Sequence, residues 1–347
     1  MRCSRQIAIG RQDTETCPRE HRVVTTCIGA AIQVELEVPP AAASPSPAGA
    51  VEYAPPFFVV GAQRSGTTML RLMLNRHPEL FVPFESGFIP DFHARSARYG
   101  DLADHASASR LLDDIADHPL VRKGGLVGDR SAILARPHAT YAELVRGIFE
   151  VEAARHGKRR WGDKTPSYVT DLDVMWTLFP GCRIVHLVRD GRDVAWSNRG
   201  VAWGIRNLPA VAADWRWKTT LGRKVGRVLG SAYLEVRYED LVLDTTAVLG
   251  KLCAFLEVDY VPDMLDYPSD AAARMPADSL RWHQNSVRAP DPGLVYAWKH
   301  RLSSADRVIF EAIAGDALDL FGYERERRPA SWKSRARSLY YATARRW

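Results

Sequence analysis

A turn of glycine, hydroxyl and cationic residues follows a short apolar run near residue 60. Residues 57–60 (Phe-Phe-Val-Val) predict a buried strand, residues 61–66 predict a turn, and apolar residues at helical spacing follow from Thr67. A strand, a glycine-bracketed turn and a helix N-terminus in this order aim backbone N–H groups at a phosphate. The expected chemistry is therefore the binding of an anionic group, and the candidate binding residues are Arg64, Ser65, Gly66, Thr67 and Thr68.

The spacing of Gly61 and Gly66 matches the nucleotide-binding P-loop pattern G-x-x-x-x-G-K-[ST] with one exception. Thr67 occupies the position of the lysine, whereas Thr68 keeps the hydroxyl. The lysine is the group that reaches the β- and γ-phosphates of ATP or GTP, so its absence predicts a site for a shorter anionic group. The turn alone leaves open the alternative of an ordinary loop between a strand and a helix.

A second candidate anion site follows a later strand. Residues 182–188 are mostly apolar and predict a buried strand, Arg189 ends it, and Ser197 lies two helical turns further on. An arginine offers forked donors to a phosphate, and a serine hydroxyl can add another donor. The alternative is a surface network of salt bridges between Arg189 and its neighbours Asp190 and Asp193.

The elements that must position these groups alternate along the chain. Strands separated by helices predict an α/β fold of the P-loop type, with three layers (α/β/α) and a mainly parallel central sheet. Ligands bind at the carboxyl ends of the strands in such sheets, so Ser65, Arg189 and Tyr238 are expected at one rim. The expected strands cover residues 57–60, 182–188 and 233–237, and the clearest expected helices cover 139–156, 209–229, 245–256 and 303–321.

Two predictions concern the stretch between these elements. Residues 161–166 (Trp-Gly-Asp-Lys-Thr-Pro) are expected to form a loop. Residues 167–179 are expected to form a helix that begins at Ser167 as a possible N-cap.

The motifs at 61–68 and 189–197 together resemble those of the PAPS-dependent sulfotransferase family, where PAPS is 3′-phosphoadenosine-5′-phosphosulfate. The resemblance implies that the turn from Arg64 to Thr68 binds the 5′-phosphosulfate and that Arg189 and Ser197 bind the 3′-phosphate. It extends from about residue 57 to residue 323, and it looks closest to the tyrosylprotein and carbohydrate sulfotransferases.

Three further stretches resemble elements of the same family. Residues 161–166 look like its lysine loop and identify Lys164 as a candidate. Residues 236–241 look like its third-strand motif, whose tyrosine, here Tyr238, contacts the nucleotide. Residues 297–299 look like its C-terminal element, which adds Lys299 as a candidate nucleotide-binding residue.

The resemblance implies transfer of a sulfuryl group from PAPS to an acceptor hydroxyl, with the 3′,5′-bisphosphate PAP as product. In-line attack needs a base for the hydroxyl proton and positive charge on the leaving phosphate. Lys164 is the candidate for the bridging oxygen, by charge or proton donation, and Glu85 is the candidate base because the related branch carries a catalytic glutamate there. Each could instead be an ordinary surface or capping side chain. Weaker candidates for the base are His77, His186, Asp91, His93 and Asp163.

The same residues bear on two other functions and on the need for a metal ion. A P-loop kinase or NTPase would need the missing lysine and a magnesium-binding aspartate after a strand. A non-catalytic nucleotide-binding protein would have no need of Lys164 and Glu85. No metal is expected, because no cluster of histidine, cysteine and carboxylate residues has ligand spacing.

Length and composition indicate one large α/β domain with extensions at both ends. Residues 1–52, with a Pro/Ala/Ser stretch at 39–47, are expected to be a flexible extension, residues 53–324 the sulfotransferase domain, and residues 325–347 a basic tail. The net charge is +6, and the tail carries eight basic residues against Glu326 alone, so the remainder is close to neutral. No nucleic-acid partner is therefore expected, whereas the tail could touch an anionic membrane surface weakly.

The remaining expectations concern location and partners. Five cysteines without a zinc or redox spacing favour a reducing compartment, so a cytoplasmic location is expected. No apolar run of membrane-spanning length and no secretory signal are recognised. The acceptor stays open among carbohydrate, peptide tyrosine and small metabolite, and the sequence predicts no oligomeric state.

Overall fold

The computed structural model describes residues 54–326 of the 347-residue chain, except residues 202–203 and 206. The predicted N-terminal extension and nearly all of the basic tail lie outside these residues, so the flexibility and the membrane contact expected of them stay predictions. Within the described part of the chain, no helix combines the length and the apolar character that crossing a membrane requires.

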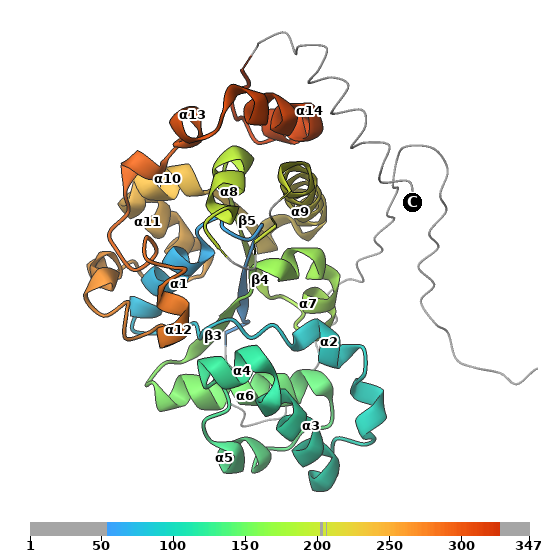
Figure 1. The fold of residues 1–347 in the computed structure, drawn as a ribbon. Helices are drawn as coiled ribbons and strands as arrows, with labels where there is room; N and C mark the ends of the chain where they lie inside the picture. The colour runs from blue at the N-terminus through green and yellow to red at the C-terminus, as the bar shows by residue number, and fades with distance from the viewer. Residues whose placement is uncertain (1–53, 202–203, 206, 327–347) are drawn as a thin grey trace, which may run out of the picture. The chain divides into compact units, whose positions relative to one another are not determined.

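A five-stranded parallel sheet forms the centre of the described fold (Figure 1). The strand order is β2-β3-β1-β4-β5, and every neighbouring pair runs parallel. The expected α/β architecture around a mainly parallel sheet is thus confirmed. The strands are β1 (Phe57–Val60), β2 (Leu80–Phe81), β3 (Arg160–Lys164), β4 (Arg183–Val188) and β5 (Tyr233–Arg237).

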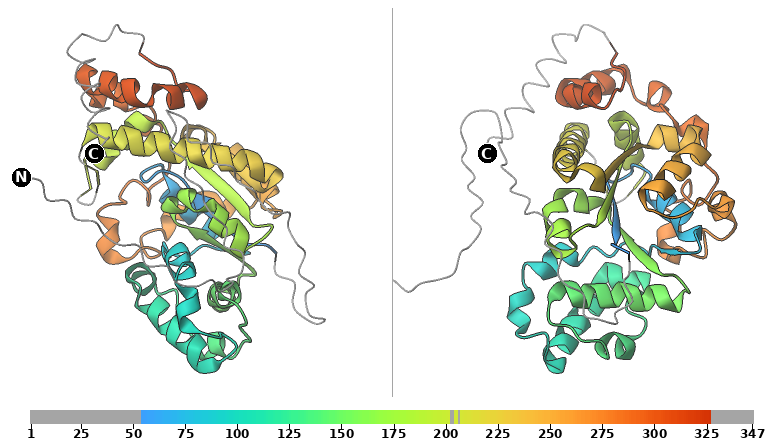
Figure 2. Two further views of the ribbon diagram at one scale, coloured as in Figure 1. Left: turned by 90° about the vertical axis from the view of Figure 1, so that its right-hand side faces the viewer. Right: turned by 180° about the vertical axis from the view of Figure 1, so that it is seen from behind.

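Helices cover both faces of this sheet (Figure 2). On one face, α1 (Thr67–Arg76) and α11 (Thr245–Phe255) pack their apolar side chains on β1, β4 and β5 in one buried core. On the other face lies α9 (Leu208–Leu229), against which α7 (Leu172–Leu178) and α14 (Ser304–Leu320) pack. Because both faces are buried, β1 is a continuous apolar run with no exposed side chain.

A group of helices lies between β2 and β3 in the chain and forms the lower part of Figure 1. The longest of them begins with a reciprocal cap, in which Thr140 and Glu143 each accept from the other's backbone N–H. The members are α2 (Ile89–His93), α3 (His105–Asp117), α4 (Pro119–Gly124), α5 (Arg130–Leu134) and α6 (Tyr141–Arg155).

Short helices complete the fold. Several of them follow strands or connect the C-terminal segments and carry residues discussed below. They are α8 (Gly191–Asn198), α10 (Tyr238–Leu243), α12 (Ala277–Leu280) and α13 (Trp298–Arg301), with the 3₁₀ helices η1 (Ser96–Tyr99), η2 (Pro166–Thr170), η3 (Gly230–Ala232), η4 (Pro262–Ser269) and η5 (Pro292–Leu294).

The prediction of a loop at residues 161–166 is wrong, because residues 161–164 belong to strand β3. All five residues of β3 are buried, and its polar Asp163 and Lys164 concealed this from sequence patterning. Gly162 permits the close strand packing, since a Cβ there would lie 2.5 Å from the ring of Phe57. Trp161 stacks on Phe149 of α6 with ring centroids 4.4 Å apart.

The prediction of a single helix at residues 167–179 is also wrong. The chain instead forms η2 and, after Asp171, the separate helix α7. Ser167 lies inside η2 and caps neither element.

Candidate active site

The turn after β1 is held in a shape that requires glycine. Gly61 donates its N–H to the carbonyl oxygen of Pro166 at 3.1 Å, which fixes the start of the turn beside the end of β3. Gly66 has φ 94°, and a Cβ there would lie 2.4 Å from the ring of Tyr238. Arg64 has φ 73°, a left-handed conformation that is costly for a residue with a side chain. The backbone therefore holds this turn tightly against Tyr238.

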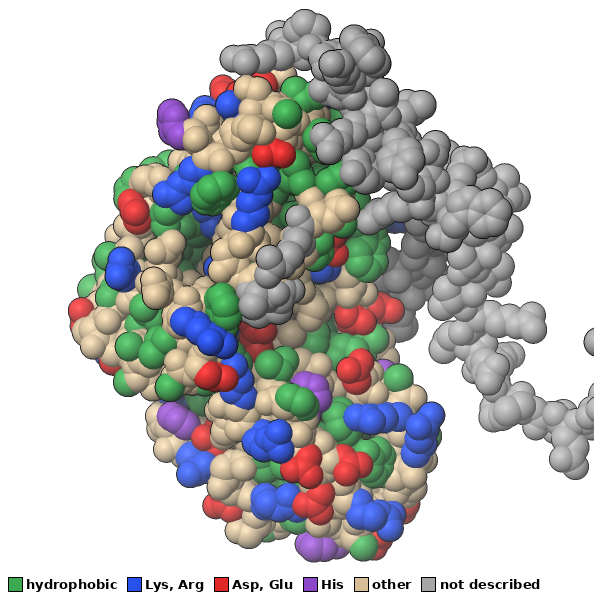
Figure 3. All heavy atoms as spheres, in the orientation of Figure 1, with side chains coloured by type: hydrophobic (Ala, Val, Ile, Leu, Met, Phe, Trp, Pro, Cys, Tyr) green, Lys and Arg blue, Asp and Glu red, His purple; other side chains and the backbone are tan. Residues whose placement is uncertain are grey.

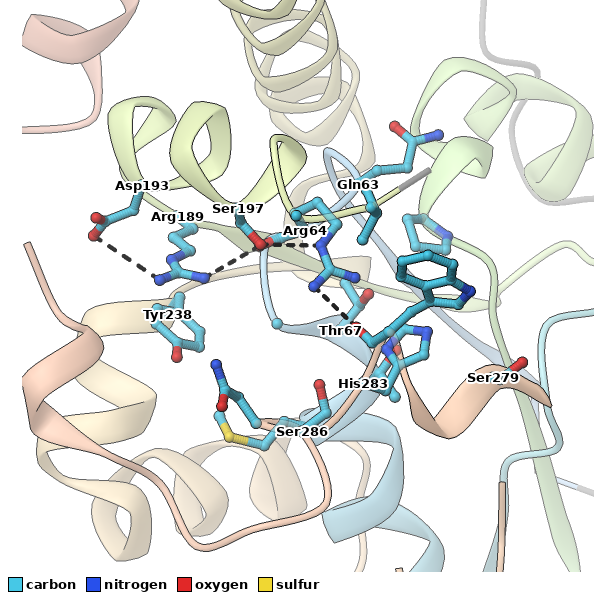
Figure 4. Close-up of a pocket in the computed structure, with 18 of the residues that line it drawn as sticks. Gln63, Arg64, Thr67, Arg189, Asp193, Ser197, Tyr238, Ser279, His283 and Ser286 are labelled. Atoms are coloured by element: carbon cyan, nitrogen blue, oxygen red, sulfur yellow. Dashed lines mark hydrogen bonds and ion pairs between the residues drawn. The ribbon is translucent and has the colours of Figure 1, made fainter. Parts of the chain in front are cut away.

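A cavity of about 850 Å³ opens beside this turn (Figure 4). Its walls come from segments that follow β1, β2, β4 and β5, so the predicted meeting of these segments at the carboxyl ends of the strands is seen in the structure. Eight of the predicted site residues line it: Arg64, Gly66, Thr67, Thr68, Glu85, Arg189, Ser197 and Tyr238.

The three donors at one end of the cavity contact one another. Arg64 donates through Nε to the hydroxyl of Ser197 at 3.0 Å, and Arg189 donates to the carbonyl oxygen of Arg64 at 3.4 Å (Figure 4). The Arg189 guanidinium also lies 4.2 Å from the ring centroid of Tyr238 and 4.0 Å from Asp193. Two arginines and one hydroxyl thus converge on one volume, which is the arrangement that binds a phosphate.

Two predicted binding residues do not line the cavity. Ser65 is fully buried under the turn, and its backbone N–H already donates to the carbonyl oxygen of Ala62 at 3.2 Å. Lys299 lies on α13 with its amine 4.0 Å from Glu324, whereas Arg301 of the same helix lines the cavity. The binding roles predicted for Ser65 and Lys299 are therefore not supported by where their side chains lie.

The two predicted catalytic residues form an ion pair at the other end of the cavity. The Lys164 ammonium donates to Glu85 and, at 3.4 Å, to the hydroxyl of Thr68. Lys164 is fully buried, and burial lowers its pKa, whereas the nearby Glu85 carboxylate opposes that shift. Lys164 thereby links the end of β3 to the first turn of α1 and to the segment after β2.

The weaker candidates for the base lie elsewhere. His77 binds the carbonyl oxygen of Asp259 at 2.7 Å, and His186 is a buried core residue beside the hydroxyl of Tyr233. Asp91, His93 and Asp163 also do not line the cavity. Among the described residues, no group of three or more His, Cys, Asp or Glu side chains is arranged to hold a metal ion.

Residues 279–286 form a wall of the cavity. The sequence pointed to Trp282 alone among them, as one of several tryptophans that could line an acceptor pocket or fill the core. Arg64 donates to the carbonyl oxygen of Trp282 at 3.2 Å, so this wall is connected to the turn after β1. The imidazole of His283 lines the cavity (Figure 4), and burial lowers its pKa to about 4, helped by the charges of Lys164 and Arg64. This segment has no sequence period, so only the structure could bring it to the site.

Basic residues dominate the charged part of the wall. Figure 3 shows Lys and Arg side chains gathered along the central part of this face. The acidic lining residues are Glu85 and Asp193. The basic ones are Arg64, Lys123, Arg189, Arg199, Arg281 and Arg301. Such a cavity favours anionic ligands.

Comparison with known proteins agrees with this chemistry. A model described as "Sulfotransferase family" matches residues 55–263. A putative protein-tyrosine sulfotransferase of Caenorhabditis briggsae is 21% identical over 236 residues, which cover 67% of this chain and 75% of that protein. Nodulation protein NoeE of Sinorhizobium fredii (strain NGR234) is 28% identical over 148 residues, 43% of this chain, and the match spans about a third of NoeE (32%).

Solved structures give the same fold. The sulfotransferase domain of the Synechococcus PCC 7002 olefin synthase is 25% identical with a TM-score of 0.55, covering 80% of this chain and 98% of that domain. The sulfotransferase domain of the curacin biosynthetic pathway is 20% identical with a TM-score of 0.55, covering 79% and 100%. The second of these supports the fold alone.

The family model covers more than half of the chain and includes the turn, Glu85, Lys164, Arg189, Ser197 and Tyr238. The kinase and non-catalytic alternatives therefore have no support, and the resemblance seen in the sequence is confirmed. The assignment also supports PAPS as the co-substrate and a hydroxyl-bearing acceptor as the partner. The chain belongs to the sulfotransferase family, and it is an enzyme that transfers sulfuryl groups.

Proposed function

We propose that PAPS and the acceptor meet in this cavity, with the 3′-phosphate at Arg189 and Ser197 and the sulfuryl group near Lys164 and Glu85. The observation that carries the proposal is that one cavity is lined both by Arg64, Arg189 and Ser197 and by Glu85, whose carboxylate is paired with the buried Lys164. PAPS carries a 3′-phosphate and a 5′-phosphosulfate and therefore needs two separate anion-binding sites. In this cavity the pair Arg189 and Ser197 offers one, and the turn after β1 offers the other.

The turn after β1 and Arg64 bind the 5′-phosphosulfate in this proposal. The helix N-terminus at Thr67 presents free backbone N–H groups, and Thr67 and Thr68 both line the cavity. Arg64 already holds the Ser197 hydroxyl at 3.0 Å, so its guanidinium lies between the two phosphate positions. The role of the missing P-loop lysine passes to Lys164 on β3.

The Lys164–Glu85 pair supplies the acid and the base. The acceptor O–H bond breaks as Glu85 takes the proton, the acceptor oxygen bonds to sulfur, and the bond between sulfur and the bridging oxygen breaks to release PAP. The Lys164 ammonium stabilises the charge that develops on that bridging oxygen. When the bridging oxygen engages Lys164, the contact between Lys164 and Glu85 weakens, and the carboxylate becomes available to the acceptor.

We further propose that this chemistry proceeds without a metal ion. Six basic side chains line the cavity and Lys164 lies beside it, so protein cations can neutralise the equatorial oxygens of the sulfuryl group.

The acceptor binds against Phe84, Leu120 and Trp282, with Lys123 and Arg281 at the margin. This wall combines apolar surface with positive charge, which suits an acceptor that carries apolar surface beside its hydroxyl. The Caenorhabditis briggsae relative is named for protein tyrosine, so peptide tyrosine is one acceptor class to test, beside carbohydrates and small metabolites.

The direct test is transfer of labelled sulfate from PAPS to pooled acceptors of these three classes, with the wild-type chain and Lys164→Met. We expect label on one class with the wild-type protein and none with Lys164→Met, while PAP still binds both in calorimetry. Equal transfer by Lys164→Met would refute the role of Lys164, and no transfer to any class would refute the acceptor proposal.

A further inference from the structure

A buried chain of hydroxyl groups fastens the Glu85 segment to β3. Ser86 lies next to Glu85, and its hydroxyl contacts the carboxylate of Asp163 and, at 2.9 Å, the hydroxyl of Tyr168. The hydroxyl of Thr165 contacts the other Asp163 oxygen at 3.2 Å. Ser86, Asp163, Thr165 and Tyr168 are each at most 2% exposed. These contacts are therefore shielded from water.

The backbone of the same segment also donates into this network. The N–H of Ser86 donates to the Thr165 hydroxyl oxygen at 3.2 Å, and the N–H of Ile89 donates to the Tyr168 hydroxyl oxygen at 3.0 Å. Both hydroxyl oxygens thus accept from the backbone, and each hydroxyl still has one O–H to donate. Thr165 and Ser86 donate to different oxygens of Asp163, and because Ser86 has only one O–H, Tyr168 donates to Ser86. Asp163 is therefore the common acceptor of the network, and its ionised form accepts at both oxygens without a proton of its own to place.

We propose that Asp163 is a positioning residue of the sulfuryl-transfer reaction, whose carboxylate fixes the segment that carries Glu85 opposite Lys164. This inference rests on the proposed role of Glu85 as base. It assigns Asp163 no contact with either substrate, since Asp163 is fully buried and does not line the cavity.

The position of Asp163 in β3, directly before Lys164, explains how its carboxylate can fix Glu85 relative to Lys164. Successive residues of a strand point to opposite faces, so Lys164 and Asp163 are directed to opposite sides. Lys164 contacts Glu85 directly, and Asp163 contacts Ser86, the next residue in the chain. The segment after β2 is thus held by two adjacent residues of one strand, which limits the freedom of Glu85 to move from Lys164.

The charge state of Asp163 gives the inference a pH dependence. Burial raises the pKa of Asp163 to about 7, although the hydrogen bonds from Ser86 and Thr165 and the charge of Lys164 oppose the shift. The charged groups that face it are Lys164 on β3 and Glu85 after β2, and the titratable neighbour on η2 is Tyr168. Protonation below pH 7 supplies an O–H that must itself donate, so the network loses its common acceptor and the Glu85 segment loosens.

The first experiment compares Asp163→Asn with wild type across pH 5.5 to 9. An amide donates where the carboxylate accepts, so kcat should fall on the order of 10²-fold at pH 8, the scale of loss for a misplaced catalytic group. The wild-type fall in kcat below about pH 7 should be absent from the variant. PAP affinity by calorimetry should stay within about twofold, because the donor-binding residues are untouched. A control is Glu150→Gln, another buried carboxylate, which binds Arg136 outside the cavity and should leave kcat unchanged.

A second pair of variants keeps the inference testable if Asp163→Asn folds poorly. Thr165→Ser retains the hydroxyl that bonds Asp163 and should keep near wild-type kcat, whereas Thr165→Val should lose kcat while keeping PAP affinity. The inference is overturned if both Thr165 variants match wild type. It is also overturned if kcat falls only in proportion to melting temperature and PAP affinity. Glu85→Gln separates the two proposals: an active Glu85→Gln refutes the base, whereas an inactive one beside an active Asp163→Asn refutes only the positioning role.

Discussion

The two ends of the cavity are built in different ways. At the phosphate-binding end, the turn at 61–68 and the pair Arg189 and Ser197 each follow a strand directly, so their positions are set by local chain geometry. At the acceptor end, the wall combines segments near residues 84, 120 and 282, which are far apart in the chain. Each half of the proposed donor site is therefore encoded by a local motif, whereas the proposed acceptor wall depends on long-range packing.

The largest effect should come from Glu85, which pairs with Lys164 and lines the cavity. Glu85→Gln keeps the size of the side chain but cannot take a proton, so kcat should fall by about 10²- to 10⁴-fold. PAP affinity should be unchanged, because the phosphate-binding end is intact. Steady-state rates and calorimetry test both parts. Glu79→Gln, at a half-buried Glu paired with Arg159, is the matched control and should keep full activity.

A fully active Glu85→Gln would remove Glu85 as the base and break the division of the cavity into two ends. A variant that lost PAP binding together with turnover would do the same, because Glu85 would then belong to the donor site.

The next effect should be confined to the phosphate-binding end. Arg189→Ala removes a guanidinium that holds the carbonyl oxygens of Arg64 and Leu294 and faces the cavity. A charged hydrogen bond contributes about 1.5–3 kcal/mol, so PAP affinity should fall by about 10- to 100-fold in calorimetry. Arg189→Lys keeps the positive charge but loses the paired N–H donors of the guanidinium, so it should retain only part of the affinity for PAP. Unchanged affinity in Arg189→Ala would place the 3′-phosphate elsewhere.

The same contrast explains what could be predicted from the sequence. The strand before the turn, the turn itself, the first helix and the strand before Arg189 were all predicted with nearly correct bounds, because apolar runs and glycine spacing encode them. The resemblance to sulfotransferases then identified Lys164, although β3 was taken for a loop. A strand that ends in Asp163 and Lys164 breaks the apolar pattern, and their buried partners compensate for the polar side chains.

The acceptor wall shows the opposite case. His283 and Trp282 lie in a segment without helical or strand period, more than 200 residues beyond Thr67 in the chain, and no local signal brings them to the cavity. Lys299 lies outside the cavity for the same reason. The resemblance pointed to its helix, but which residue of a four-residue helix faces the cavity depends on packing, here of Trp298 against the Arg192 guanidinium, 3.6 Å from its ring centroid. Residue types followed from the sequence, whereas side-chain directions required the fold.

The smallest effect should come from His283, and it tests whether this residue of the cavity wall is buried beside Lys164 and Arg64 as the structure has it. Burial, with Lys164 and Arg64, lowers the pKa of His283 to about 4, below the value of about 6.5 in the unfolded chain. The unfolded chain therefore binds more protons between about pH 4 and 6.5, and stability falls as pH falls through this range. His283→Asn removes that loss, so its melting temperature relative to wild type should be higher at pH 5 than at pH 8. Because the imidazole is neutral above pH 6.5, kcat at pH 8 should change only a few-fold. An equal difference in melting temperature at both pH values would mean that the pKa of His283 is not lowered in the folded protein.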